Sequence, residues 1–292
     1  MPTLAPLLTS DGLRLAAESA GTGPVQVLAP NGACFLAALA PVWVRHPAVA
    51  VDLRNRGGSD PVADTARLAR GVLNDVDDLE AVRTQLGLER IDLVAHSYVA
   101  VVALLYAIAH PQRVRRLVLL SPAPSDPAAH PTPPPDATTT RVFARLAALQ
   151  QTPPPGDAEA RCRAIWAVLK DLYVADPALA APVADWGRCH LPNERAFMGY
   201  WTTCLEPSLR RAAPSDAALV RVTCPVLVVH GTADRSAPYE GGRAWARRLP
   251  DARLLTLEGA AHAPWIERPA VIAAIGEFLD GAWPEGAVAV GA

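Results

Sequence analysis

The feature that most constrains the fold is a series of three apolar segments within residues 90–122. The first, "RIDLVAH", has the length of a buried strand, and the second, "YVAVVALLYAIAH", is apolar on all sides and long enough for a helix. The third, "VRRLVLLSP", again fits a strand. A strand, a buried helix and a strand at this spacing predict a parallel βαβ unit with both sheet faces covered. The chain is therefore expected to be an α/β protein.

The segments on either side continue this alternation. Four more have the short apolar pattern of strands: residues 24–30, 48–53, 224–231 and 252–259. Helices are expected at residues 35–44, 66–86 and 266–280. Together these segments predict a mostly parallel central sheet flanked by helices.

Residues 123–222 interrupt the alternation. Two stretches, "PAPSDPAAHPTPPPDATTT" and "QQTPPPGD", are rich in proline, which lacks the backbone N–H that a sheet requires. Helices are expected at 140–150, 157–174 and 192–204. We therefore expect a core of residues 1–122 and 223–285 with a helical insertion between two of its strands. The last residues, 286–292, are expected to form a disordered tail.

Charge and composition exclude several classes of partner. The formal net charge is -2 and there is no basic stripe, so no nucleic-acid partner is expected. No segment approaches the roughly 18 apolar residues of a membrane span. The first residues lack the cationic start and the cleavage site of a signal peptide. We expect a cytoplasmic protein with no membrane partner.

Neither the cysteines nor the acidic residues have the pattern of a metal site. The five cysteines form no C-x-x-C pair, and their odd number argues against a disulfide framework, so small buried side chains are expected. Asp75, Asp77 and Asp78 lie together in the expected helix 66–86, where a solvated face is the simpler interpretation. No metal and no cofactor are expected.

Ser97 lies between the strand "RIDLVAH" and the buried helix. This places its hydroxyl on a sharp turn at the carboxyl end of a parallel strand, where open α/β sheets bind ligands. The alternative is a helix N-cap, because serine is among the favoured capping residues. The segment alone does not separate the two roles.

Asp234 and His262 favour a chemical role for Ser97. A serine hydroxyl needs a base, commonly histidine, which in turn needs an acid to fix its tautomer and to stabilise its cation. Asp234 follows the strand 224–231, and His262 follows the next strand. All three residues are therefore expected at one edge of the sheet, as a Ser97–His262–Asp234 triad.

The chain resembles α/β-hydrolase-fold proteins over nearly its whole length. "DLRNRGGSD" is similar to the family's D-x-R-G-x-G-x-S turn, "HGTADRSAP" to its acid loop and "GAAHAPWIERP" to its histidine loop, while 123–222 corresponds to its helical cap. The order serine, acid, histidine is also that of the family. The resemblance implies backbone N–H groups of Ala33 and Tyr98 as oxyanion donors. Asn31 stands where the family usually has histidine.

The serine turn departs from the family pattern G-x-S-x-G. Here it reads Ala95-His96-Ser97-Tyr98-Val99, so both glycines are replaced. Glycine allows a tight turn and a close approach of helix to strand. Val99 is the larger change, because it adds a β-branched side chain at a crowded contact.

Other residues have weaker claims to the site. Asp126 is an alternative acid, and His96 and His230 are expected to pack beside the triad. Cys34 has no evident base partner and is not expected to be a nucleophile. The expected substrate pocket contains Asn31, Cys34, Trp166, Tyr200, Trp201 and Tyr239, and Trp186 is a further aromatic candidate.

Three classes of function fit these observations. The first is a cofactor-independent serine hydrolase that acts on a small ester, lactone or amide through an acyl-enzyme; a prolyl aminopeptidase-like peptidase ranks below an esterase. The second is a non-hydrolytic acyltransferase, lyase or cyclase on the same fold, and the third is a binding protein. A homodimer is possible. Fold alone does not choose among them.

Overall fold

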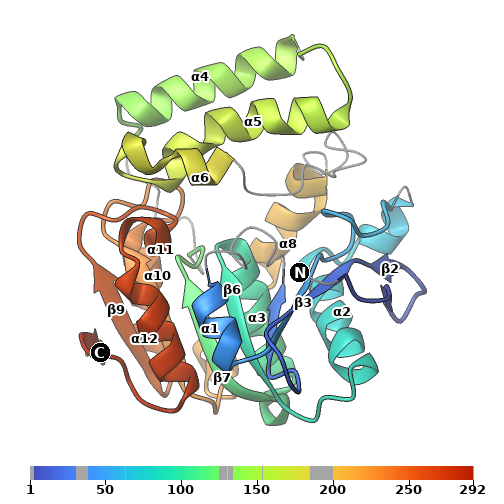
Figure 1. The fold of residues 1–292 in the computed structure, drawn as a ribbon, viewed down its shortest axis with the longest axis vertical. Helices are drawn as coiled ribbons and strands as arrows, with labels where there is room; N and C mark the ends of the chain where they lie inside the picture. The colour runs from blue at the N-terminus through green and yellow to red at the C-terminus, as the bar shows by residue number, and fades with distance from the viewer. Residues whose placement is uncertain are drawn as a thin grey trace.

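A computed structural model describes most of the chain, and its centre is a single large sheet with helices on both faces (Figure 1). The described residues are 3–30, 39–62, 64–124, 130, 134–152, 154–184 and 200–291. Among them, no helix has the length and hydropathy needed to cross a membrane.

The described part of the chain contains an eight-stranded sheet whose six inner strands are parallel. Its strands, in spatial order, are β10 (Ala287–Val288), β9 (Ala252–Leu257), β8 (Val226–Gly231), β7 (Val114–Leu120), β6 (Ile91–His96), β4 (Val27–Pro30), β5 (Ala48–Val51) and β3 (Ala17–Ala20). The edge strands β3 and β10 run antiparallel to their neighbours. A separate hairpin joins β1 (Leu7–Leu8) to β2 (Arg14–Leu15). The predicted α/β class with a mostly parallel sheet is confirmed.

Helices cover the two faces of the sheet and divide the core into two layers. One layer holds α2 (Val72–Gln85), α3 (Tyr98–Ala109) and α10 (Tyr239–Arg248). The other holds α1 (Ala40–Arg45) and α12 (Ala270–Leu279). Strand side chains alternate between the layers: Leu93 and Ala95 of β6 face the first, and Val94 faces the second. All three are completely buried, as expected for an inner parallel strand.

The expected helix at 66–86 is interrupted. Thr65–Leu68 form a short 3-10 helix, η2, and α2 begins only at Val72. Gly71 has φ 55°, and a Cβ at this position would lie 2.1 Å from Ser208 Oγ. That hydroxyl accepts a hydrogen bond from Val72 N at 2.9 Å and so caps the first turn of α2. A contact between residues 136 positions apart cannot be read from local pattern.

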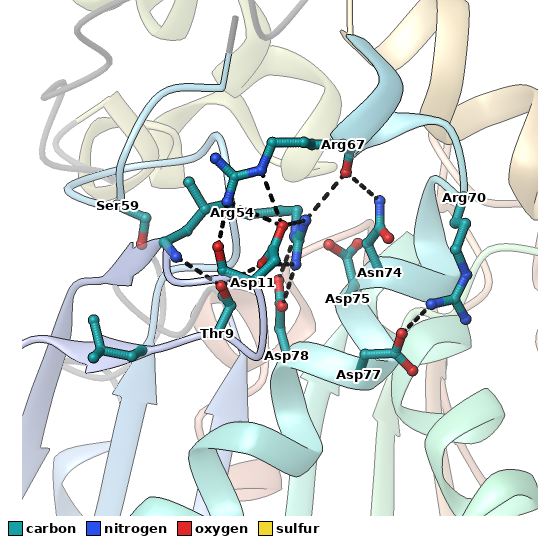
Figure 2. A network of polar contacts seen from close by, with 12 residues as sticks. Thr9, Asp11, Arg54, Ser59, Arg67, Arg70, Asn74, Asp75, Asp77 and Asp78 are labelled. Atoms are coloured by element: carbon teal, nitrogen blue, oxygen red, sulfur yellow. Dashed lines mark hydrogen bonds and ion pairs between the residues drawn. The ribbon is translucent and has the colours of Figure 1, made fainter. Parts of the chain in front are cut away.

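The acidic cluster on α2 is not a solvated face, so this prediction is wrong for two of its three residues. Asp75 and Asp78 are completely buried, and only Asp77 reaches the surface. Two arginines of the loop after β5 neutralise the buried carboxylates: Arg54 bonds Asp78 (Figure 2), and Arg56 bonds Asp75. A buried side chain can stay ionised when an oppositely charged group is bonded to it in this way.

The insertion forms helices above the sheet (Figure 1). The helices are α4 (Ala137–Gln151), α5 (Ala158–Tyr173) with a 3-10 turn η4 (Pro177–Leu179) after it, and α6 (Ala181–Ala184). The expected helices at 140–150 and 157–174 are confirmed. Most of the expected helix at 192–204 lies outside the described residues. Cys162 on α5 is disulfide-bonded, so the expectation of no disulfide is wrong at this position.

The end of the insertion packs on the core. After the π-helical turn η5 (Trp201–Leu205), the chain forms α8 (Glu206–Arg211) and α9 (Asp216–Leu219). Leu205, Leu219 and Val222 belong to the same apolar layer as α2 and α3. The packing of the core therefore includes residues before the expected boundary at 222/223.

Two features of the C-terminal part differ from expectation. The helix α10 was not predicted, because two adjacent glycines in "YEGGRAWARR" disfavour a helix, yet its Trp245 is buried in the core. Residues 287 and 288 form β10, which pairs with β9, so the expected tail from 286 onward is not disordered there. The final helical segments are α11 (Pro264–Glu267) and α12, with a break at Arg268 and Pro269.

Candidate active site

Ser97 occupies a strained turn between β6 and α3. Its φ of 59° lies in the left-handed region, which non-glycine residues seldom adopt. Two backbone bonds hold the turn: Ser97 N donates to Leu120 O at 2.9 Å, and Ala123 N donates to Ser97 O at 3.2 Å. The Ser97 side chain forms no capping bond to α3. The geometry therefore does not fit the alternative of an N-cap.

The hydroxyl instead lies 3.0 Å from His262 Nε2. On the other side of the imidazole, His262 Nδ1 lies 2.7 Å from Asp234 Oδ2. Because a carboxylate only accepts, Nδ1 carries the proton and Nε2 is left as an acceptor for the Ser97 hydroxyl. The structure thus brings together the three residues of the expected triad, with the tautomer that a general base requires.

Asp234 is buried but fully hydrogen-bonded. Its Oδ1 accepts from the backbone N–H groups of Ser236 and Ala237, both at 2.8 Å. Its Oδ2 lies 3.2 Å from His230 Nε2 as well as beside His262. Burial acts to raise the pKa of Asp234, but the charge of His262 and the hydrogen bonds from both histidines outweigh it and hold the pKa far below its ordinary value. The carboxylate is therefore ionised and can stabilise an imidazolium.

The acid loop and the histidine loop approach each other closely at Gly231. A Cβ at this position would lie 2.1 Å from Ala260 O, so only glycine fits. Glu267, nine-tenths buried, then fixes the histidine loop: its Oε2 accepts from Ala261 N at 2.6 Å. Its Oε1 accepts from the backbone N–H groups of residues 175 and 176, at 2.7 and 3.1 Å. One carboxylate therefore joins the histidine loop to the end of α5.

His96 contacts both the backbone and the ring of His262. Its Nε2 lies 2.9 Å from His262 O, and the two rings are 4.5 Å apart. Burial lowers the pKa of His96 well below its ordinary value, so the ring is neutral and donates Nε2–H to that carbonyl. The edge of Trp265 packs on the same imidazole, 5.0 Å away. As expected, His96 and His230 pack beside the triad.

The insertion contributes two aromatic side chains that pack beside His262. Tyr173, at the end of α5, packs edge-on against His262 with ring centroids 5.0 Å apart, and Trp166 packs on Tyr173 at 5.5 Å. The backbone is joined as well, because Ala263 N donates to Tyr173 O at 2.8 Å. The predicted pocket residue Trp166 thus reaches the site through Tyr173, which sequence analysis missed.

A second aromatic group lies on the other side of Ser97. The ring of Tyr98 packs edge-on against Trp201 at 5.0 Å. The Arg56 guanidinium lies 5.7 Å from the centre of the Tyr98 ring and 5.5 Å from that of Tyr200. The predicted pocket residues Tyr200 and Trp201 therefore lie together near the serine turn. Arg56 was missed, although it lies in the quoted segment "DLRNRGGSD" and its charge matches the acidic cluster on α2.

Of the remaining predicted residues, only Tyr239 lies in the described part of the chain, and it is not brought to Ser97. Tyr239 begins α10, and its hydroxyl bonds Thr256 Oγ1 at 2.7 Å, while its ring faces His230 rather than the serine. Several others lie outside the described residues: Asn31, Ala33, Cys34, Asp126 and Trp186. No group of three or more His, Cys, Asp or Glu side chains in the described part of the chain could hold a metal ion.

Comparisons with known proteins identify the family of the chain. The family model of the alpha/beta hydrolase fold matches residues 33–269. The chain is 28% identical to a pimeloyl-[acyl-carrier protein] methyl ester esterase of Neisseria meningitidis, over 80% of this chain and 83% of that protein. It is 25% identical to a proline iminopeptidase of Heyndrickxia coagulans, over 90% and 92% of the two chains.

A solved structure shows the same fold. The serine hydrolase CCSP0084 of Cycloclasticus zankles superposes with a TM-score of 0.73 at 17% identity, covering 96% of this chain and 98% of that chain. With the family model spanning most of the sequence, the chain belongs to the alpha/beta hydrolase fold family.

Proposed function

We propose that this protein is a cofactor-independent serine hydrolase that cleaves a small-molecule ester through an acyl-enzyme. The observation that carries the proposal is the continuous hydrogen-bonded chain from Ser97 Oγ through His262 to Asp234, built on a strained turn. The similarity to a methyl ester esterase supports an ester as the substrate. Lactones and amides present the same carbonyl chemistry and remain secondary candidates.

The reaction follows from these positions. Ser97 Oγ attacks the ester carbonyl carbon while His262 Nε2 takes the hydroxyl proton, and the ionised Asp234 stabilises the imidazolium. The tetrahedral intermediate collapses when its C–O bond to the leaving group breaks and His262 returns the proton to that oxygen. Water, deprotonated by His262, then attacks the acyl-enzyme, and Ser97 leaves as the restored hydroxyl. The first backbone N–H of α3, that of Tyr98, is the proposed oxyanion donor, with Ala33 as its partner.

The replaced glycines of the serine turn are compatible with this proposal. Ala95 is completely buried and Val99 is 4% exposed, within the apolar layer that also holds Val102 and Tyr106. Val99 is therefore a packed core side chain. The turn retains its positive φ at Ser97 with valine in this place.

The decisive experiment is reaction with a fluorophosphonate probe followed by peptide mapping. We expect the label on Ser97. Ser97→Ala and His262→Ala should each lower kcat for aryl esters by several orders of magnitude, and Asp234→Asn somewhat less. Ser121→Ala is a matched control, because Ser121 also follows a strand and has a positive φ, but its hydroxyl has no hydrogen-bond partner in the described part of the chain.

Four results would contradict the proposal. Labelling of Ser121, or unchanged turnover in Ser97→Ala, would remove the role of the Ser97 hydroxyl. Labelling of Ser97 without release of free acid, but with transfer of the acyl group to an added alcohol or amine, would instead identify an acyltransferase. An activity confined to N-terminal prolyl amides would favour the peptidase alternative.

A further inference from the structure

Two buried polar groups near the serine turn have no hydrogen-bond partner among the residues that the structure describes. They are Arg56 Nε and the hydroxyl of Tyr200. Arg56 is 5% exposed and Tyr200 is 3% exposed, so neither group is satisfied by bulk water. Buried donors are nearly always paired in folded proteins, so each unpaired one needs an explanation, such as strain, a catalytic role or a bound group that completes it.

The two groups belong to one cluster. The Arg56 guanidinium carbon lies 5.5 Å from the centre of the Tyr200 ring and 5.7 Å from that of Tyr98, which follows Ser97 directly. Trp201 is the fourth member of the cluster, because its ring packs edge-on against that of Tyr98. Arg56 therefore packs on the side chain that follows the proposed nucleophile, and Tyr200 packs on Arg56.

Strand order determines which part of a substrate this cluster faces. Asp234 and His262 follow β8 and β9, on one side of β6, whereas Arg56 follows β5 on the other side. His262 has to protonate the leaving oxygen, so the leaving group lies on the β8–β9 side. The acyl group of the substrate then extends toward the cluster of Arg56 and Tyr200.

The charge of the cluster determines the kind of oxygen it accepts. Both terminal nitrogens of Arg56 donate to Asp75, each at 2.8 Å, so the buried pair is neutral overall. A carboxylate bound here would add an unmatched negative charge in a buried place. Burial raises the pKa of Tyr200 far above its ordinary value, so its phenol keeps its proton and can donate. Two spare donors without net charge suit a neutral oxygen.

We propose that Arg56 Nε and the Tyr200 hydroxyl form a subsite for an uncharged oxygen, such as a ketone, ether or amide oxygen, in the acyl part of the substrate. The subsite rests on the proposed hydrolase function, because it assumes an acyl group attached through Ser97. The subsite predicts that the protein prefers substrates whose acyl chain carries a neutral hydrogen-bond acceptor rather than a free carboxylate.

The test compares p-nitrophenyl esters of equal chain length. One series is all-carbon, one carries a single ether or keto oxygen at successive positions, and one ends in a carboxylate. We expect at least one oxygenated ester to exceed its all-carbon match about tenfold in kcat/KM, as one added hydrogen bond would give. The carboxylate esters should fall below the all-carbon ones. In Tyr200→Phe the tenfold preference should shrink to nearly one.

Tyr106→Phe is the matched control. Tyr106 is also a buried tyrosine, but its hydroxyl donates to Glu80 at 2.6 Å on the far side of α3, so this variant should keep the full preference. Should Tyr200→Phe not fold, the double variant Arg56→Met with Asp75→Leu removes the other donor without leaving a buried charge. An absent preference in the native protein, or a preference that survives loss of either donor, overturns the subsite.

Binding measurements separate this proposal from the hydrolase proposal. In Ser97→Ala, N-methyl amides of the same acids can be titrated by calorimetry. Tighter binding of the oxygenated amides that is lost in Ser97→Ala/Tyr200→Phe supports the subsite, even if no ester is turned over and Ser97 is not labelled. Equal binding of both series by Ser97→Ala overturns it, even if ester hydrolysis itself is found.

Discussion

Two arginines of one loop form two buried ion pairs that differ in how completely each guanidinium is used. Every nitrogen of Arg54 donates: Nε and Nη2 to Asp78 at 2.7 and 2.6 Å, Nη2 also to Asp11 at 3.1 Å, and Nη1 to Arg67 O at 3.1 Å (Figure 2). Among the described residues, Arg56, two positions later, donates only to Asp75, and its Nε has no partner there.

The comparison separates the structural role of Arg54 from the binding role proposed for Arg56. Arg54 joins the turn between β1 and β2, the turn η2 and the helix α2, because its partners come from all three. Arg56 joins only one helix to its loop and packs between two tyrosine rings beside Ser97. A fully bonded guanidinium has no capacity left for a ligand, whereas a partly bonded one has.

The largest effect is expected from Arg54→Met. This change leaves Asp78 buried without its cation, and breaking a buried pair from one side costs about 3 to 5 kcal/mol of unfolding free energy. Urea unfolding followed by circular dichroism measures it. Arg70→Met is the control: Arg70 pairs with Asp77 at the surface, where such pairs contribute about 0 to 1 kcal/mol. Equal losses in the two variants would contradict the structural role of Arg54.

The double variants Arg56→Met/Asp75→Leu and Arg54→Met/Asp78→Leu compare the two pairs directly. Replacing both partners of a buried pair by apolar side chains is often nearly neutral for stability. The unfolding free energy of the first double variant should therefore lie within about 1 to 2 kcal/mol of the native value. The unfolding free energy of the second double variant should be about 2 kcal/mol lower than that of the first, because Asp11 and Arg67 O also lose their donor. If both doubles are equally stable, the additional bonds of Arg54 contribute nothing measurable.

The sequence indicated the edge of the sheet and the residues placed there, but not the buried charges beneath. Ser97, Asp234 and His262 each follow an apolar strand. Because the carboxyl ends of parallel strands meet at one edge of the sheet, this local pattern was sufficient to predict that the three residues lie together. The pair Arg56–Asp75 spans 19 residues and two elements. No local pattern distinguishes a charged side chain that pairs inside the protein from one that faces water.

The contacts between the insertion and the site were beyond sequence analysis for a related reason. Tyr173 ends an amphipathic helix and looks like any aromatic residue of a helix interface. Its position against His262 depends on Glu267, which bonds the backbone after α5 and the histidine loop at once. Backbone acceptors and donors are identical at every residue, so the sequence carries no signal for such a bridge.

The smallest expected effect concerns the outer partner of Arg54. Burial acts to raise the pKa of Asp11, but the hydrogen bond from Thr9 and the charge of Arg54 lower it from 3.8 to about 2. A pKa that is lower in the folded state means that Asp11 stabilises the fold above about pH 4 and that this contribution is lost as the pH falls toward about 2. The Asp11 side chain is 37% exposed, so solvent screening keeps the effect below about 1 kcal/mol.

Asp11→Asn should therefore lower the unfolding free energy slightly at neutral pH and give a shallower loss of stability between about pH 4 and pH 2.5 than the native protein shows. Urea midpoints at several pH values measure this slope. Asp77→Asn, which removes the surface partner of Arg70, provides the comparison. If both variants give the same slope, Arg54 holds Asp11 no better than a surface arginine would. The number of bonded nitrogens would then no longer distinguish Arg54 from Arg56. The difference between the two ion pairs would depend on Asp78 and Asp75 alone.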